Sequence, residues 1–248
     1  MNRVGLIVGS AELPWSVQWA DIGNTNTEFG EASAQPVIAT VGSCEVVRLV
    51  RHGKAHSIAP HAVNYRANLA LLHSLEVTAI VALNTVGGIS ESATAGSILM
   101  PDQIIDYTWG RAQTFSADED VHHIDFSTPY DARLRAQLLR AAELAQTTVL
   151  DRGVMGVTQG PRLETAAEIE RMERDGCAVV GMTGMPEASL ARELGIAFAS
   201  VCLVVNPAAG RGADSIDLAV IADVAKQGMI AVGELLRLFF LEIFESVK

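Results

Sequence analysis

Short apolar runs alternate with longer amphipathic stretches along almost the whole chain, and this pattern limits the possible folds more than any other feature. The apolar runs, which predict strands, are residues 4–8, 37–41, 46–50, 77–83, 98–106, 154–157, 178–180 and 196–205. Several of them are apolar on both faces, as in a sheet covered on both sides. The amphipathic stretches, which predict helices, are residues 62–73, 131–146, 164–175, 186–194 and about 215–244. The polar segments 24–35 and 116–122 predict surface loops.

This alternation predicts one α/β domain over residues 1–248, with a central mixed, largely buried β-sheet flanked by helices. A chain of 248 residues with 49% hydrophobic residues can bury a large core, which excludes intrinsic disorder. The stripe of apolar residues along the last predicted helix is interpreted as core.

The charge balance limits the possible partners. The chain has 18 Lys and Arg residues against 29 Asp and Glu residues, a formal net charge of −11. Such a surface argues against binding to nucleic acids or to anionic membranes, because both need basic residues. An anionic substrate would have to be attracted by a local site.

The cysteines suggest neither a disulfide framework nor a metal site. Cys44, Cys177 and Cys202 are odd in number and lack the CxxC spacing of a zinc site. Free cysteines favour a reducing compartment, and the cytoplasm is the expected location. The apolar run before Glu12 is too short for the core of a signal peptide, and no segment predicts a membrane span.

Five segments place small or polar residues directly after a predicted strand, where a doubly covered sheet binds its ligands. Val8-Gly9-Ser10 offers close backbone approach and a hydroxyl for an anion, although a simple turn is the alternative. Arg51-His52-Gly53 offers a guanidinium that matches phosphate, although a surface salt bridge is equally open. Asn84-Thr85-Val86-Gly87-Gly88 exposes backbone amides and leaves room for a flat ring.

The other two segments suggest groups that could contact a base and a phosphate. In Gly160-Pro161-Arg162-Leu163-Glu164-Thr165, Glu164 either favours the start of a helix or accepts from a ligand N–H. In Met182-Thr183-Gly184-Met185-Pro186-Glu187, Thr183 either caps a helix or helps to hold phosphate. Asn206, at the end of the strand predicted over 196–205, can pair with a ring edge as donor and acceptor.

In this order, the segments resemble the trimeric purine nucleoside phosphorylase and methylthioadenosine phosphorylase family, from about residue 4 to residue 240. The Arg51-His52-Gly53 region, with His56 and Val63-Asn64-Tyr65, is similar to the methylthioadenosine branch. The 84–88 segment resembles the family's Asn-Ala-Ala-Gly-Gly loop. The 160–165 segment resembles the Gly-Pro-x-Phe-Glu-Thr turn of the purine branch, and the 182–187 segment resembles the Met-Ser/Thr-Thr-Val-Pro-Glu motif. Two departures are the missing second glycine after Gly9 and the glycine at position 184, where the family has Thr.

The resemblance implies a pentosyltransferase of purine salvage that assembles as a homotrimer and needs no cofactor or metal, with inorganic phosphate as co-substrate. It implies that phosphate is held by Ser10, Arg51, His52, the backbone at Thr85, and Thr183. It places the purine near Val86, Gly87 and Leu163, with Glu164 and Asn206 at its edge, Met182 under the ribose, and His123 close to a neighbouring subunit's site. The residues expected to act in catalysis are Asn206, Glu164, Arg51 and His52.

These residue types suit phosphorolysis, because phosphate is the nucleophile and the protein must position it and stabilise charge on the leaving purine. Glu164 and Asn206 suit a 6-oxopurine, since a carboxylate can accept from N1–H. No His follows His123, so the 5′-hydroxyl ligand of the oxopurine branch is missing, and Ile216 could face an apolar 5′ substituent.

The predicted reaction therefore converts 5′-methylthioinosine and phosphate to hypoxanthine and 5-methylthioribose 1-phosphate. Inosine or guanosine is the first alternative, with Asp217 binding the 5′-hydroxyl, and methylthioadenosine is the second. A nucleoside-binding protein without catalysis and a hydrolytic nucleosidase stay open as other classes. A strict requirement for phosphate would exclude the nucleosidase.

Overall fold

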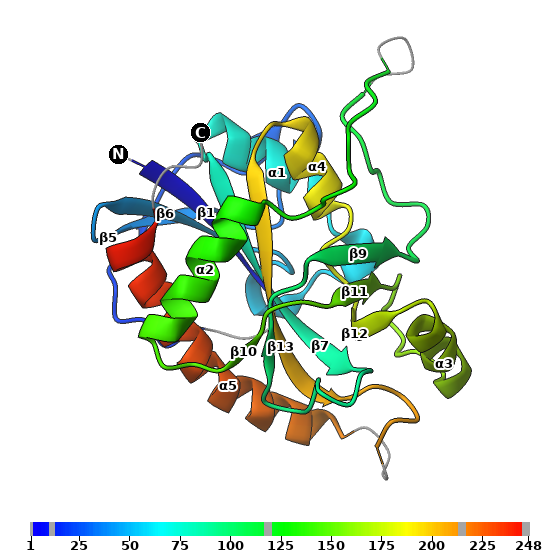
Figure 1. Cartoon of the computed structure of the whole chain (residues 1–248). Helices are drawn as coiled ribbons and strands as arrows, with labels where there is room; N and C mark the ends of the chain where they lie inside the picture. Colours follow the sequence, from blue (N-terminus) through cyan, green and yellow to red (C-terminus); the bar gives the residue numbers. More distant parts are fainter. Residues whose placement is uncertain (1, 10–12, 117–120, 213–216, 245–248) are drawn as a thin grey trace.

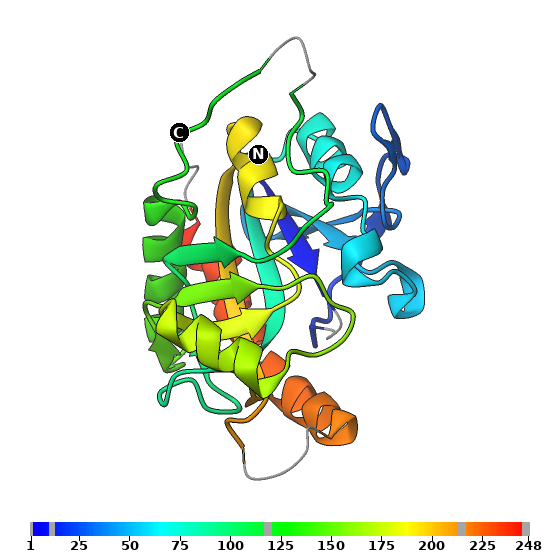
Figure 2. The ribbon, with the colours of Figure 1, turned by 90° about the vertical axis from the view of Figure 1, so that its right-hand side faces the viewer.

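A long mixed β-sheet crosses the molecule, and helices pack on both of its faces (Figure 1; Figure 2). The computed structural model describes residues 2–9, 13–116, 121–212 and 217–244. The strands in these residues are β1 (Asn2–Val8), β2 (Ala20–Asp21), β3 (Asn26–Thr27), β4 (Gly30–Glu31), β5 (Val37–Val41), β6 (Cys44–Val50), β7 (Ala79–Gly88), β8 (Ile98–Leu99), β9 (Gln103–Asp106), β10 (Val149–Leu150), β11 (Val154–Val157), β12 (Cys177–Gly181) and β13 (Ala197–Pro207).

The sheet order explains how distant segments come together. The strands run β10-β8-β13-β7-β1-β6-β5-β2, while β12 pairs with the end of β7 and continues through β11 to β9. Strands β13, β7, β1 and β6 are neighbours and are all parallel. Their carboxyl ends therefore meet at one edge of the sheet, where Gly9 and Arg51 follow β1 and β6. The 84–88 segment was expected after its strand but forms the last part of β7, and the 160–165 and 182–187 segments follow β11 and β12.

Two helices cover each face of the main sheet, and another packs beside β12. They are α1 (Tyr65–Ser74), α2 (Ala132–Leu144), α3 (Ala166–Arg174), α4 (Glu187–Glu193) and α5 (Leu218–Leu238), and α5 continues as a π-turn over Phe239–Ile243. The helix beside β12 is α3. Leu138 of α2 and Val232 of α5 are fully buried in the core on one face. Leu69 of α1 and Leu190 of α4 are fully buried in the core on the other face. This double cover confirms the α/β fold with a largely buried mixed sheet.

The predicted helices and most predicted strands are present, with shifted ends. The last helix begins at Leu218, because the Asp217 side chain accepts from the Ala219 amide at 2.8 Å and caps it. The interpretation of its apolar stripe as core is confirmed at Val232, Leu235 and Phe239, which are fully buried, whereas Ile221 and Val224 near the start of the helix are only half-buried. None of the helices in the described residues is long and apolar enough to cross a membrane.

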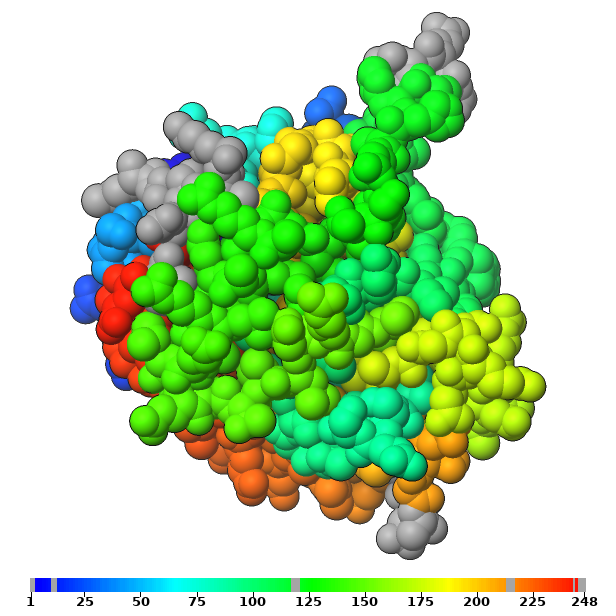
Figure 3. Space-filling view, viewed as in Figure 1, coloured from blue at the N-terminus to red at the C-terminus, as the bar shows by residue number. Residues whose placement is uncertain are grey.

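Two sequence predictions are wrong in detail. The strand expected over 98–106 is two strands, β8 and β9, because Pro101 has no N–H to continue a ladder and the Arg135 guanidinium donates to the Pro101 carbonyl at 2.9 Å. The loop expected over 24–35 contains the small β3–β4 hairpin, which packs Phe29 beside α1. In contrast, the segment between β9 and α2 forms no helix or strand in its described residues, and it projects from the body of the molecule (Figure 3).

Candidate functional site

A cavity of about 230 Å³ lies where the parallel strands end, and we refer to it as the strand-end cavity. Many of its lining residues come from the segments that the sequence analysis singled out: Gly9, Arg51, His52, Asn84, Thr85, Val86, Gly87, Leu163, Glu164, Met182, Thr183 and Asn206. The fold thus brings all five segments to one place. Among the described residues, the expected phosphate ligands Arg51, His52, Thr85 and Thr183 line this cavity together with Glu164 and Asn206.

Arg51 is completely buried and already paired. Its Nε and Nη2 atoms donate to the two carboxylate oxygens of Glu187, at 2.6 and 2.9 Å, and Nη1 donates to the Leu83 carbonyl at 3.0 Å. A guanidinium has five N–H donors, so at most two remain for an anion. A Cβ on Gly9 would lie 3.3 Å from the Arg51 Nη1 atom, which explains the glycine after β1. The surface salt bridge weighed as the alternative for Arg51 is wrong, because this ion pair is buried.

Glu187 is the important residue on this side that sequence reasoning did not identify. It lies in the first turn of α4, is fully buried, and faces Arg51 across 136 residues of sequence. In the sequence, Glu187 follows Pro186 and indicates only the start of a helix. Its ion pair with the distant Arg51 could not be predicted from this pattern.

The His52 side chain is neutral, and one of its two ring nitrogens already takes part in a hydrogen bond. Its Nδ1 atom lies 2.9 Å from the Ile58 carbonyl oxygen, and because a carbonyl only accepts, Nδ1 carries the proton. Burial, and next the positive charge of Arg51, lower the pKa of His52 to about 4. The neutral ring therefore presents Nε2 as an acceptor, beside the His56 ring at 4.4 Å between centroids.

Thr183 belongs to a buried polar chain. Its hydroxyl donates to the Asn84 side-chain oxygen at 2.9 Å, and the Asn84 amide nitrogen donates to the Ser200 hydroxyl at 3.3 Å. The Thr183 oxygen can still accept, but its proton is in use. The next residue, Gly184, has a φ of +109°, which a threonine would adopt only with strain. This conformation explains the departure from the family motif at this position.

Glu164 and Asn206 form a less enclosed side of the cavity. The Thr158 hydroxyl lies 2.5 Å from Glu164 Oε1, and Asn206 Nδ2 donates to the Pro207 carbonyl at 2.6 Å. Asn206 stands at a shift in register between β13 and β7, and such a bulge re-aims a side chain. Both residues keep unused acceptor atoms for a ligand.

The turn between Thr158 and Glu164 packs closely against Met182. Gly160 has a φ of +60°, and a Cβ there would lie 2.6 Å from the Met182 sulfur, so only glycine fits. Of the two adjacent glycines in the 84–88 segment, Gly87 lines the cavity. Gly88 serves packing instead, because its Cβ would lie 1.8 Å from the Ala93 carbonyl oxygen.

Arg111 holds these two segments together, and no sequence signal pointed to it. The residue is 8% exposed and comes from the projecting segment after β9. Its guanidinium donates to the backbone carbonyls of Thr158, Gln159, Met182 and Met185, and to the Tyr65 hydroxyl and the Gln159 side chain, at 2.6 to 3.3 Å. One side chain therefore fixes the loop before Glu164 and the turn that carries Thr183.

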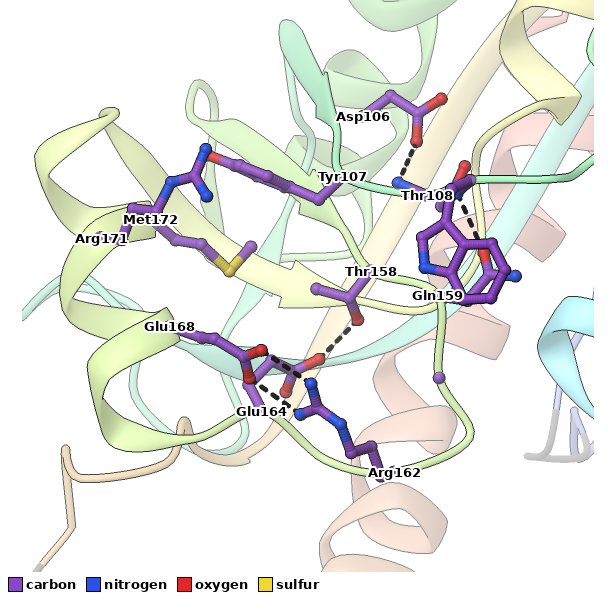
Figure 4. Close-up of a pocket in the computed structure, with 12 residues that line it drawn as sticks. Asp106, Tyr107, Thr108, Thr158, Gln159, Arg162, Glu164, Glu168, Arg171 and Met172 are labelled. Atoms are coloured by element: carbon purple, nitrogen blue, oxygen red, sulfur yellow. Dashed lines mark hydrogen bonds and ion pairs between the residues drawn. The ribbon is translucent and has the colours of Figure 1, made fainter.

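A second, larger cavity of about 550 Å³ lies behind Glu164, and we refer to it as the outer cavity (Figure 4). Its walls include Tyr107, Thr158, Arg162 and Arg171, and Glu164 lines both cavities. Arg162 forms an exposed ion pair with Glu168 at 2.7 Å. The Glu164 carboxylate thus stands in the wall between the two spaces.

Two predicted site residues, Ser10 and Ile216, lie outside the described residues. His123 is exposed on the projecting segment and is absent from the lining of the cavity. Leu218 and Ile221 give the cavity an apolar wall close to Asp217. No sequence pattern pointed to Leu218, and Ile221 was predicted to belong to the core stripe of the last helix. Across the described ranges, no group of three or more His, Cys, Asp and Glu residues is placed to hold a metal ion.

Comparisons with known proteins place the chain in a family. The sequence profile of the Phosphorylase superfamily matches residues 3–240. A probable S-methyl-5′-thioinosine phosphorylase from Pseudomonas syringae pv. tomato is 50% identical over 206 residues, which are 82% of this chain and 84% of that protein. A 6-oxopurine nucleoside phosphorylase from Pyrococcus furiosus is 40% identical over 217 residues, which are 85% of this chain and 81% of that protein. Among solved structures, methylthioadenosine phosphorylase from Schistosoma mansoni in complex with tubercidin is 31% identical, with a TM-score of 0.87 and coverage of 97% of this chain and 91% of that one.

Proposed function

The chain belongs to the Phosphorylase superfamily and is an enzyme of the purine nucleoside phosphorylase type, and we propose that its substrate is a 6-oxopurine nucleoside with an apolar 5′ substituent, 5′-methylthioinosine. The products are hypoxanthine and 5-methylthioribose 1-phosphate. The observation that carries this proposal is the pairing of two polar groups, Glu164 and Asn206, with two apolar ones, Leu218 and Ile221, in one cavity. Relatives named for methylthioinosine and for 6-oxopurine nucleosides support the same choice.

The base edge favours a 6-oxopurine. Glu164 is a carboxylate that accepts hydrogen bonds, and a 6-oxopurine offers it the N1–H donor, whereas a 6-aminopurine has a bare N1. Asn206 offers both an oxygen and an N–H, so it can accept from a protonated N7 and donate to O6. A site that pairs polar groups in this way rejects a mismatched edge, by up to about 10⁴-fold.

The sugar side favours an apolar 5′ group. Leu218 and Ile221 lie on the first turns of α5 and line the cavity. Asp217, the alternative ligand of a 5′-hydroxyl, already accepts from the Ala219 amide as the helix cap. A methylthio group would bury apolar surface against the two side chains, at roughly 0.8 kcal/mol for each CH₂-sized group.

In the proposed reaction, a phosphate oxygen attacks C1′ of the ribose as the bond from C1′ to N9 breaks. The electron pair of that bond moves into the purine, which takes up a proton at N7 and leaves as the neutral base. Hydrogen phosphate gives up its P–OH proton as it becomes the phosphate ester, and this proton balances the one that the purine gains. Asn206 stabilises the charge that develops on the purine by hydrogen bonding, and Glu164 holds the N1–H edge.

Arg51 donates to phosphate oxygens with the N–H groups that Glu187 and the Leu83 carbonyl leave unused. The Thr183 oxygen, whose proton goes to Asn84, can only accept from a P–OH group. His52 Nε2 accepts from the P–OH of hydrogen phosphate or from a ribose hydroxyl, since Nδ1 donates to Ile58.

We propose further that the enzyme works as a homotrimer, in which His123 reaches the cavity of a neighbouring subunit. His123 lies exposed on the projecting segment, where Trp109 and Val121 are also 72% and 63% exposed. A second copy would cover these apolar side chains. The three cysteines are free and buried, which fits our placement of the protein in the cytoplasm.

The test of function is base release from 5′-methylthioinosine, inosine and methylthioadenosine, each with and without phosphate. We expect phosphate-dependent cleavage with the highest kcat/KM for methylthioinosine. Preference for inosine would contradict the apolar sugar side, and preference for methylthioadenosine would contradict the base edge. Cleavage without phosphate would identify a nucleosidase. Light scattering of the same preparation, with kinetics of His123→Ala, tests the trimer and the shared site.

A further inference from the structure

The hydrogen bond between Thr158 and Glu164 lies behind the base edge, on the side of the outer cavity. Thr158 Oγ1 is 2.5 Å from Glu164 Oε1, and Figure 4 shows the hydroxyl directed at the carboxylate. Thr158 lines only the outer cavity, whereas Glu164 lines both cavities. A ligand in the strand-end cavity would thus meet Glu164 on one side and leave Thr158 on the other.

Thr158 is held in place from three directions. Its backbone N–H donates to the Gly181 carbonyl at 2.8 Å, and its own carbonyl accepts from Arg111 at 3.1 Å. The hydroxyl also lies 3.4 Å from the Gly181 carbonyl, much farther than from Glu164, so its proton points to the carboxylate. A β-branched side chain has restricted χ1 freedom, and with its backbone held at both ends the donor is preorganised.

This donor determines which hydrogen bonds Glu164 can make. Of the residues that the structure describes, Thr158 is the one that donates to the Glu164 carboxylate, and it occupies Oε1. The carboxylate then offers Oε2 to a ligand, purely as an acceptor. The hydrogen bond also opposes rotation of the carboxyl group, because turning Glu164 away would break it.

We propose that Thr158 is a positioning residue that makes Glu164 select 6-oxopurines over 6-aminopurines, which rests on the proposed function. A fixed carboxylate oxygen accepts from the N1–H of a 6-oxopurine. A 6-aminopurine presents a lone pair at N1, which faces the same oxygen unless Glu164 turns away. Thr158 disfavours this rotation, so it acts on the choice of base without touching the base.

The experiment compares Thr158→Val with Thr158→Ser in the full-length enzyme. Valine keeps the shape and the β-branch but removes the donor, whereas serine keeps the donor. The assays are kcat/KM for 5′-methylthioinosine and methylthioadenosine, and the Kd values of free hypoxanthine and adenine by calorimetry. Hydrogen bonds to charged groups are strong, so we expect Thr158→Val to lower the methylthioinosine-to-methylthioadenosine ratio about tenfold or more. The hypoxanthine-to-adenine affinity ratio should fall with it, and Thr158→Ser should keep both ratios within about threefold.

The other outcomes are separable. An equal loss for both nucleosides, with unchanged ratios, would mean that Thr158 only supports the fold and would overturn the proposal. If Glu164→Gln lowers the ratio and Thr158→Val does not, the role of Thr158 is overturned while the proposed function stands. A wild-type enzyme that cleaves neither nucleoside with phosphate overturns both. Should Thr158→Val not fold, Thr158→Ala removes the same donor and is judged by the same ratios.

Discussion

The two sides of the strand-end cavity are built in different ways. On the phosphate side, Arg51 and Thr183 are buried, and their partners Glu187 and Asn84 lie 136 and 99 residues away in sequence. On the base side, Glu164 and Asn206 are half-buried, and their partners Thr158 and Pro207 lie 6 and 1 residues away. The phosphate side is therefore part of the global fold, whereas the base side depends on local loop structure.

This difference suits the two substrates. Phosphate is one constant, strongly solvated anion, and a rigid set of prearranged donors and acceptors loses little entropy when it binds. The base varies among nucleosides, and its recognition can change by substitution in a loop without loss of the fold. A substitution on the phosphate side should thus act mainly on stability, and one on the base side mainly on activity.

The largest effect is a difference in the free energy of unfolding between two variants that carry the same Glu-to-Gln change. These variants are Glu187→Gln on the phosphate side and Glu164→Gln on the base side. The first leaves the buried Arg51 charge without its partner. Removing one member of a buried ion pair costs about 3–5 kcal/mol, so Glu187→Gln should lose most of its stability. Glu164→Gln should stay within about 1 kcal/mol of wild type, because its site is open to water. Denaturant titration measures both, and equal losses would abolish the distinction between the two sides.

The second prediction concerns activity and uses two asparagines. Asn206→Ala removes a hydrogen bond to the leaving purine, which costs about 2.7–4 kcal/mol, or 10²–10³-fold in kcat. The stability of this variant should change by about 0.5 kcal/mol or less. Asn84→Ala is the matched variant on the phosphate side. It leaves the buried Thr183 and Ser200 hydroxyls without their partner, at a cost of roughly 1–3 kcal/mol in stability. Steady-state kinetics and denaturant titration are needed for both, and a loss below about tenfold for Asn206→Ala would contradict its role.

The third prediction is a pH dependence of stability that comes from the phosphate side. The pKa of His52 is about 4 in the folded protein and 6.5 in a free side chain. The unfolded state therefore binds more protons between these values, and stability falls as the pH drops from 6.5 to 4. The full contribution is about 3 kcal/mol and is lost below pH 4.

His52→Asn tests this dependence, because the Asn side chain can donate to the Ile58 carbonyl as Nδ1 does but does not titrate. Urea titrations from pH 4 to pH 7 should show a flatter curve for the variant than for wild type. Parallel curves would show that His52 contributes nothing to the acid sensitivity of the fold.

The same contrast explains how far the sequence could predict this site. Strand ends were predictable from apolar runs, and the parallel strands bring Arg51, Asn84 and Asn206 to one edge, so the lining of the cavity followed from local patterns. The partner of Arg51 was not predictable, since Glu187 in isolation has the sequence pattern of an ordinary helix start. Arg111 gave no signal because its six hydrogen bonds go mainly to backbone carbonyls, which any sequence supplies. Pro101 itself was a visible sign of the break between β8 and β9, but the apolar run over residues 98–106 favoured the prediction of a single strand.

The smallest effect is expected at the rim of the outer cavity, where Arg162→Ala removes the ion pair with Glu168. Both side chains are largely exposed, at 67% and 43%, and exposed pairs contribute little because solvent screens them. Glu168 also keeps its second role, since its carboxylate accepts from the Thr165 amide at 2.7 Å and closes the capping box of α3. We expect the Tm to change by about 2 °C or less, and kcat/KM for methylthioinosine to stay within about threefold of wild type. Arg162 lies two residues from Glu164, so a larger change in kcat/KM with an unchanged Tm would mean that the base side extends beyond Glu164 to the wall of the outer cavity.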